Sequence, residues 1–351
     1  MSKYRDLVIS YDEDLQLFRT GVKRCWFGVL VVGLAAAPWA GAALGGNYAV
    51  YLLNLTGIAV IVALGLNLLI GSTGLVSLGH AAFLAVGAYT AGVLANRLGF
   101  PFWMTLTLSG IFTGGIGVIV GLPALRLKGL YLGLATLAFQ FVTEHLILHW
   151  EGLTGGANGM AVPRPALGEF TFGTDLRFYY LTAPLALLLG LGIANLQRSR
   201  FGRALVAIRD SDVAAEAVGV DLARYKTLAF GVSAAYAGVA GSLFAHYLGY
   251  IGPDHFTVLL SVEYLTMVIM GGMGSILGSV LGAILATLLP EGLRLAEGAL
   301  RQSYPSLVFP DLRALVMGLV LILFIVFEPE GLAGLWRRVR EYWQEWPFSK
   351  R

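Results

Sequence analysis

The chain has 351 residues, of which 57% are hydrophobic and only 13% are charged. Soluble domains carry about 25% charged residues, so this composition excludes an ordinary soluble fold and indicates a membrane protein. The net charge of +3 comes with no nucleic-acid motif or basic stripe, so we expect no nucleic-acid partner. The lone Cys25 excludes an internal disulfide.

The N-terminal 25 residues mix acidic and basic side chains and lack the apolar core of a secretory signal, so we expect a cytosolic tail over residues 1–25. From Cys25 to Asn96 the sequence contains no Asp, Glu, Lys or Arg. Because ~20 apolar residues cross the hydrocarbon layer, this run has room for three crossings. Its residues do not alternate as barrel strands do. The sequence therefore predicts an all-α membrane protein, a polytopic helical bundle that spans a lipid membrane.

About ten apolar segments are predicted to cross the membrane. They cover residues 26–45, 48–70, 75–96, 102–125, 129–149, 178–197, 227–248, 256–272, 275–292 and 312–328. Basic residues concentrate in the N-terminal tail, in the segment 198–226 and in the C-terminal tail 331–351. Since cytosolic loops carry an excess of Lys and Arg, these three regions are expected in the cytoplasm, around a transmembrane domain over 26–330.

Glycines and polar residues interrupt the apolar stretch Gly65–Leu94 at GSTGLVSLGH, from Gly71 to His80. A second break, GGMGS at Gly271–Ser275, repeats the spacing of the first two glycines, which suggests two related halves. One interpretation is a tight turn between packed helices. The other is a broken helix whose free N–H groups face a polar solute along a pathway. The candidate pathway residues are Asn67, Gly71, Gly74, Ser77, Gly79, His80, Glu263, Gly271 and Gly274.

Glu263 lies within the predicted segment 256–272, where a charge in contact with lipid costs ~2.5–3.5 kcal/mol. It should therefore face a pathway, an interface or the outer edge of the membrane. His145 and His149 share a helix face, but two ligands are too few for a metal site, and we expect none. No nucleophile–base pair points to an enzyme.

The segment 198–226 contains a capped short helix in RDSDVAAEAVGV. Asp210 or Ser211 is expected to cap it, with Asp212 in the first turn and Gly219 closing it. The result is a helix of one or two turns beneath the membrane. It is either a surface helix without a partner or a helix that docks in the groove of another protein.

Three stretches together resemble the LivM-type permeases of branched-chain amino-acid ABC importers. They are GLNLLIGSTGLVSLGHAAFLAVGAYTAGVL, RSRFGRALVAIRDSDVAAEAVGVDLARYKTLAF and LLSVEYLTMVIMGGMGSILGSVLGA. The resemblance implies that Ala215, Glu216 and Gly219 form a coupling helix that docks on an ATPase, flanked by Arg209 and Asp212. It also implies two ATPase subunits, a sister permease of LivH type and an external binding protein, in the inner membrane of a bacterium.

The sequence contains no Gly-Lys dipeptide and hence no P-loop, so no ATP cofactor is expected on this chain. Partner subunits would bind ATP. No charged clamp for an α-amino acid is evident, so specificity would rest mainly with the binding protein. Two alternatives stay open: a related permease for urea or short amides, and an ion-coupled secondary transporter. The second should carry several intramembrane acids, and this chain offers chiefly Glu263.

Overall fold

The computed structural model describes residues 21–125, 127, 129–168, 170–303 and 312–345. Three predicted features lie outside this range: the N-terminal tail up to residue 20, the loop residues Arg126 and Lys128, and the last six residues. The helices are α2 (Gly21–Thr73), α3 (His80–Leu98), α4 (Phe102–Ala124), α5 (Leu130–His149), α6 (Glu151–Thr154), η1 (Gly156–Asn158), α7 (Asp175–Arg198), α8 (Arg200–Asp210), α9 (Asp212–Ala217), α10 (Leu222–Leu248), η2 (Pro253–Phe256), α11 (Val258–Gly271), α12 (Ile276–Ser303), α13 (Leu312–Phe327) and α14 (Gly331–Glu345).

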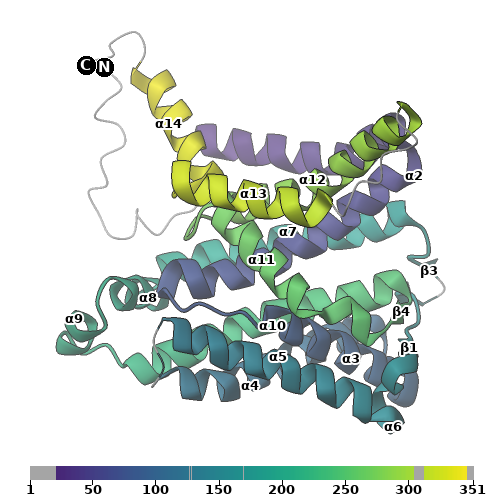
Figure 1. Ribbon diagram of the computed structural model, residues 1–351, viewed down its shortest axis with the longest axis horizontal. Helices are drawn as coiled ribbons and strands as arrows, with labels where there is room; N and C mark the ends of the chain where they lie inside the picture. The colour runs from purple at the N-terminus through teal and green to yellow at the C-terminus, as the bar shows by residue number, and fades with distance from the viewer. Residues whose placement is uncertain (1–20, 126, 128, 169, 304–311, 346–351) are drawn as a thin grey trace.

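Four short strands complete the described secondary structure. Strand β1 (Met160–Ala161) pairs antiparallel with β4 (Tyr250–Ile251), and β2 (Ala166–Leu167) pairs antiparallel with β3 (Phe170–Thr171). The first pair joins the loop after α5 to the loop after α10. These strands lie at the end of the bundle opposite α8 and α9 (Figure 1).

The predicted polytopic helical bundle is confirmed. Eight helical stretches among the described residues are long and apolar enough to cross a membrane, and the bent pair α13–α14 makes a possible ninth. The predicted segments 26–45 and 48–70 are the two arms of α2, which separate at Gly46, where φ is 64°. The predicted segment 256–272 forms α11, which has only 14 residues. At 1.5 Å per residue α11 reaches about 21 Å, less than the ~30 Å of the hydrocarbon layer.

Glycines at the spacing expected for helix packing bring backbones into contact. A Cβ on Gly282 of α12 would lie 1.9 Å from the carbonyl oxygen of Met267 in α11, and one on Gly117 of α4 would lie 2.3 Å from the Cβ of Ala234 in α10. Without side chains at these positions, pairs of helices approach closely and gain van der Waals contact. Helix α10 lies at the centre of the bundle and packs against α2, α3 and α4.

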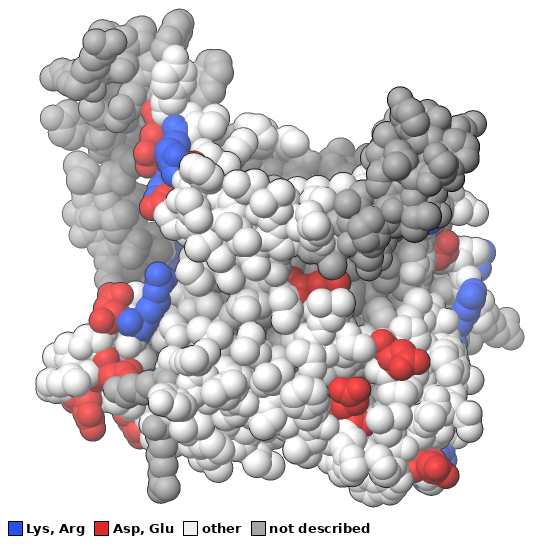
Figure 2. All heavy atoms as spheres, in the orientation of Figure 1, with Lys and Arg blue, Asp and Glu red and all other residues white. Residues whose placement is uncertain are grey.

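Charged side chains are sparse along the helices and more frequent at their ends. Figure 2 shows the lysines and arginines of one face gathered near the two ends of the bundle, while the middle is white apart from a few carboxylates. Helices α8, α9 and α14 lie at one end, which we call the α8/α9 end (Figure 1). This distribution fits a bundle whose middle lies in lipid.

Candidate functional site

The two glycine breaks, which are 200 residues apart in sequence, contact each other. Asn67 accepts a hydrogen bond from the backbone N–H of Gly274 at 2.7 Å, and its amide donates to the carbonyl of Ser275 at 2.8 Å. A Cβ on Gly71 would lie 2.2 Å from the nitrogen of Gly274. We call this contact between Gly71–Gly74 and Gly271–Gly274 the glycine junction. It requires glycine at Gly71 because a side chain would displace the backbone of the second break.

Arg209, at the C-terminal end of α8, bonds to the same junction. Its Nη1 donates a hydrogen bond of 2.7 Å to the carbonyl oxygen of Gly71. It also lies beside the second break, since a Cβ on Gly274 would be 3.4 Å from Nη1. One guanidinium therefore connects the segment predicted to dock on a partner with both breaks.

The turn between α13 and α14 packs on the other side of the junction. A Cβ on Gly331 would lie 2.5 Å from the nitrogen of Gly272, and one on Gly272 would lie 2.5 Å from the carbonyl oxygen of Glu330. Both glycines have positive φ, 65° and 112°. The α8/α9 end therefore joins four segments at one point: the two breaks, α8 and the α13–α14 turn.

Helices α3 and α11 both begin inside the protein. Ala81, in the first turn of α3, donates its N–H to the Ser261 hydroxyl in the first turn of α11 at 2.9 Å. Ser261 in turn donates to Gln140 at 3.3 Å, and the Gln140 amide donates to the carbonyl of Phe256 at 2.7 Å. Gln140 lies near the middle of α5, so both first turns lie about halfway along a spanning helix. Their N-terminal ends carry partial positive charge into the interior.

Between Thr73 and His80 the chain is irregular and runs through the protein from the junction to this interior point. The N–H of Leu78 bonds the Thr136 hydroxyl of α5 at 2.9 Å. A Cβ on Gly79 would lie 2.1 Å from the carbonyl oxygen of Thr136. The space that Gly79 leaves is thus filled by the backbone of α5, which fits the tight-packing interpretation at this position.

Ser77 and His80 are fully buried, and neither the Ser77 hydroxyl nor either ring nitrogen of His80 has a hydrogen-bond partner among the described residues. The His80 ring contacts Phe83 edge-on, with 5.7 Å between ring centroids. Buried polar groups without partners are uncommon and call for an explanation. Together with Thr136, Gln140 and Ser261 they form what we call the interior polar cluster.

The short helix α9 has the predicted caps. Ser211 rather than Asp210 is the N-cap, and its hydroxyl accepts a hydrogen bond from the N–H of Ala214 at 3.3 Å. At the other end Gly219 has a φ of 88°, and its N–H bonds the carbonyl of Glu216 at 2.9 Å. The Val220 N–H reaches the Ala215 carbonyl at 3.0 Å, which completes a Schellman motif.

The residues predicted for coupling divide into two groups on α9. Glu216 and Gly219 are exposed, as are Val213 and Val218, with 76% and 79% of their surface accessible. Ala215 is 2% exposed and faces the body of the protein. It therefore supports the helix and is not available to a partner.

Asp212 holds α9 to the bundle. Both of its carboxylate oxygens lie 2.9 Å from Nζ of Lys226, whose side chain is 5% exposed. A nearly buried ammonium needs a close counter-charge, since an uncompensated buried charge is strongly destabilising. The pair fixes α9 against the first turns of α10. Lys226 was not among our candidates because a lysine in a basic loop gives no sign of its burial.

Glu263 is half-buried on α11, beside Val262, which is 39% exposed. The carboxylate therefore lies at the boundary of the packed core. The hydrogen bonds of the interior polar cluster run through Ser261 on the same helix.

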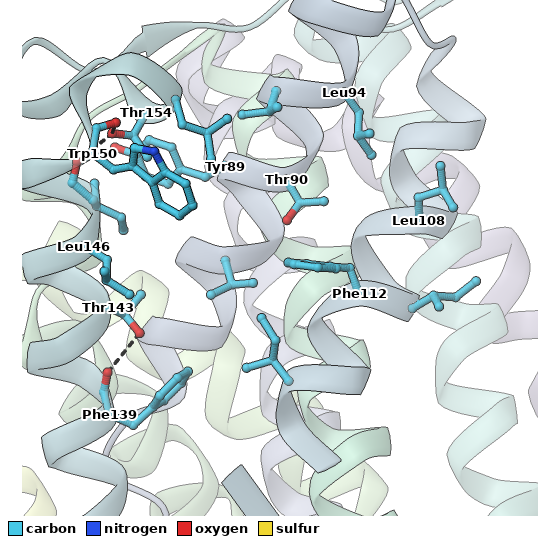
Figure 3. A pocket seen from close by; sticks show the side chains of 16 residues that line it. Tyr89, Thr90, Leu94, Leu108, Phe112, Phe139, Thr143, Leu146, Trp150 and Thr154 are labelled. Carbon is cyan, nitrogen blue, oxygen red and sulfur yellow. Dashed lines mark hydrogen bonds between the residues drawn. The ribbon is translucent and has the colours of Figure 1, made fainter. Parts of the chain in front are cut away.

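An apolar crevice of about 630 Å³ opens between α3, α4 and α5 (Figure 3). Phe112, Leu146 and Trp150 line it and are each more than half exposed. The Thr143 hydroxyl donates to the carbonyl of Phe139 in its own helix, and the Thr154 hydroxyl of α6 donates to the carbonyl of Ile147 in α5, so neither points a free donor into the space. The lining residues include no charged side chain, and the crevice suits a hydrocarbon better than a zwitterion.

Discontinuous helices that start in the interior, with polar side chains at their N-termini, are a feature of membrane transport proteins. The family model described as "Branched-chain amino acid transport system / permease component" matches residues 48–325. The chain belongs to this family of permeases.

Three curated relatives illustrate the similarity. The high-affinity branched-chain amino acid transport system permease protein LivM of Salmonella typhimurium is 34% identical over 308 residues, which cover 81% of this chain and 69% of LivM. LivM of Escherichia coli K12 has the same identity and coverage. The permease protein LivH of Escherichia coli K12 is 24% identical over 78% of this chain and 90% of LivH. No solved structure matches the chain.

Sequence reasoning missed Gln140 and Ser261 as members of the site. Both residues lie in apolar segments, with nothing local in sequence to distinguish them. A signal was present in the short length of the predicted segment 256–272, because a helix too short to cross the membrane must begin or end inside it.

Proposed function

We propose that the chain is a permease subunit of an ABC importer for branched-chain amino acids. Similarity to LivM over 81% of the chain supports this assignment. So does a predicted ATPase-docking segment that bonds to the paired helix breaks through Arg209. The other subunits are a sister permease of LivH type, two ATPases and an external binding protein. The chain lies in the bacterial inner membrane with both termini in the cytoplasm, so the α8/α9 end is cytoplasmic.

In this mechanism the exposed face of α9, with Val213, Glu216 and Val218, docks in a groove of an ATPase. Movement of α9 passes to α8 through the single residue Ser211 that separates them. It then reaches both breaks through the bond between Arg209 and the Gly71 carbonyl. The irregular segment after Thr73 carries the movement to Ser77 and His80, the buried groups that we assign to the solute pathway.

The test is ATP-dependent uptake by the complete complex reconstituted in liposomes, with the binding protein on the side of the membrane opposite the α8/α9 end. We expect uptake of leucine, isoleucine and valine only when ATP is present on the α8/α9 side. Accumulation of urea or acetamide in preference to these amino acids would overturn the substrate assignment. Accumulation driven by an ion gradient without ATP would overturn the importer mechanism.

A further inference from the structure

A groove of about 460 Å³ lies at the α8/α9 end, between the second glycine break and α14. Gly272, Met273 and Ser275 form one wall. The opposite wall comes from α14 and includes Trp336 and Arg340. Unlike the apolar crevice between α3, α4 and α5, this groove presents polar and charged groups to its interior.

The charge of the groove is predominantly positive. Three guanidinium groups line it, from Arg209, Arg337 and Arg340, against the one carboxylate of Glu330. Arg337 bonds to Glu330, which leaves the other two charges uncompensated by an acid in the groove. Arg340 makes no hydrogen bond or ion pair within the described part of the chain, and Arg209 uses only Nη1 to bond a neutral carbonyl. An anion placed here would find several N–H donors and excess positive charge.

Helix α14 also has the character of a helix that lies in a membrane surface. It follows α13 after a bend of 46°, at the end of an apolar helix. Leu335, Trp336, Val339 and Tyr342 occur at helical spacing and are 37–61% exposed. Trp and Tyr side chains concentrate at the level of the lipid headgroups, and amphipathic helices bury such a face at that depth.

We propose that this groove binds the phosphate of an anionic phospholipid from the cytoplasmic leaflet. The proposal rests on the proposed function for the identity of the leaflet. Free phosphate shares the headgroup's chemistry, but the exposed apolar face of α14 favours a ligand that also has acyl chains. The headgroup would lie beside Arg209 and the Gly271–Gly274 break. Lipid binding is therefore expected to stabilise one arrangement of the glycine junction.

The complex is extracted, purified and exchanged into phosphatidylcholine that contains an increasing fraction of phosphatidylglycerol. Native mass spectrometry then measures how much phosphatidylglycerol stays bound. Arg340→Gln removes a groove charge and is exposed, so the fold should tolerate it. Arg338→Gln is the matched control, because Arg338 lies on the same helix but pairs with Glu328 outside the groove. We expect about fivefold weaker phosphatidylglycerol binding in the first variant and a much smaller change in the second.

Equal losses in the two variants would mean a diffuse charge effect and would overturn the groove as the site. A second arm adds inorganic phosphate to the complex in phosphatidylcholine that contains a fixed amount of phosphatidylglycerol. If phosphate alone competes with phosphatidylglycerol at equal concentration, the ligand is a soluble anion and the lipid assignment is wrong. The binding readout needs neither ATP nor an amino acid, so it stays informative if the proposed transport function fails.

Discussion

Arg209→Gln is expected to separate ATP hydrolysis from transport. The side chain donates a 2.7 Å hydrogen bond to the Gly71 carbonyl, and a bond from a charged donor contributes about 1.5–3 kcal/mol. Because Arg209 is exposed overall, we take the lower end of this range. A loss of about 1.5 kcal/mol changes an equilibrium constant about tenfold, so we expect about tenfold less amino acid taken up per ATP hydrolysed. Arg209→Lys keeps the charge but loses the planar guanidinium, so its uptake per ATP hydrolysed should lie between that of the wild type and that of Arg209→Gln.

The assay is uptake of labelled leucine into proteoliposomes, with ATP hydrolysis measured on the same preparation at matched amounts of complex. Arg200→Gln is the control, since Arg200 is exposed at the opposite end of α8, away from the junction. We expect its ratio of uptake to hydrolysis to equal that of the wild type. The reasoning is wrong if Arg209→Gln retains the wild-type ratio, or if Arg200→Gln lowers it as much.

Three further predictions concern other parts of the site. Glu216→Lys and Gly219→Leu should leave the chain in the membrane but reduce both co-purified ATPase and uptake, because both residues are exposed at the predicted docking helix. Normal recovery of ATPase together with normal uptake would contradict this prediction. Gly79→Leu should lower membrane abundance, since a Cβ there meets a backbone oxygen at 2.1 Å. At Gly74 the nearest neighbour of a Cβ is 3.7 Å away, but φ is 72°, where any other residue is strained, so Gly74→Leu should lose some membrane abundance, less than Gly79→Leu, as well as uptake per molecule. Glu263→Gln should reduce uptake modestly. Glu263→Leu should reduce it far more, because it leaves a partner donor unpaired at a cost of roughly 1–3 kcal/mol. If both variants take up substrate at the wild-type rate at matched membrane abundance, Glu263 faces neither the pathway nor an interface.

Local features of the sequence were sufficient to predict α9 and most of the spans, although not that the segment 256–272 is too short to cross the membrane. The cap at Ser211 and the closing glycine at Gly219 act on their own neighbours within the chain, so their chemistry determines both ends of the helix. The apolar runs are similarly informative because length and polarity alone decide whether a helix can lie in lipid. Both breaks lie at the same end as the segment 198–226, because Arg209 of that segment lies beside Gly71 and Gly274.

The contacts between distant segments were not predictable in this way. Asn67 lies in an apolar helix, and nothing near it in sequence indicates that it bonds Gly274. The same holds for Gln140, whose partners Phe256 and Ser261 lie more than 100 residues away. A polar side chain in a spanning helix must find a partner, but the sequence alone does not identify which of several helices provides it.

The segment after Thr73 connects the glycine junction to the interior polar cluster, and the proposed mechanism depends on this connection. Gly74 has a φ of 72° and Leu75 begins an irregular stretch that ends at His80, the first residue of α3. Regular helix would place its hydrogen bonds within itself and resist a change in length. An irregular segment instead bonds its surroundings, as Leu78 does with Thr136, so a change in its course breaks no hydrogen bond within a helix. In the proposed mechanism a displacement of Arg209 at the α8/α9 end reaches the Gly71 carbonyl through their hydrogen bond and passes from there along the backbone to the buried His80.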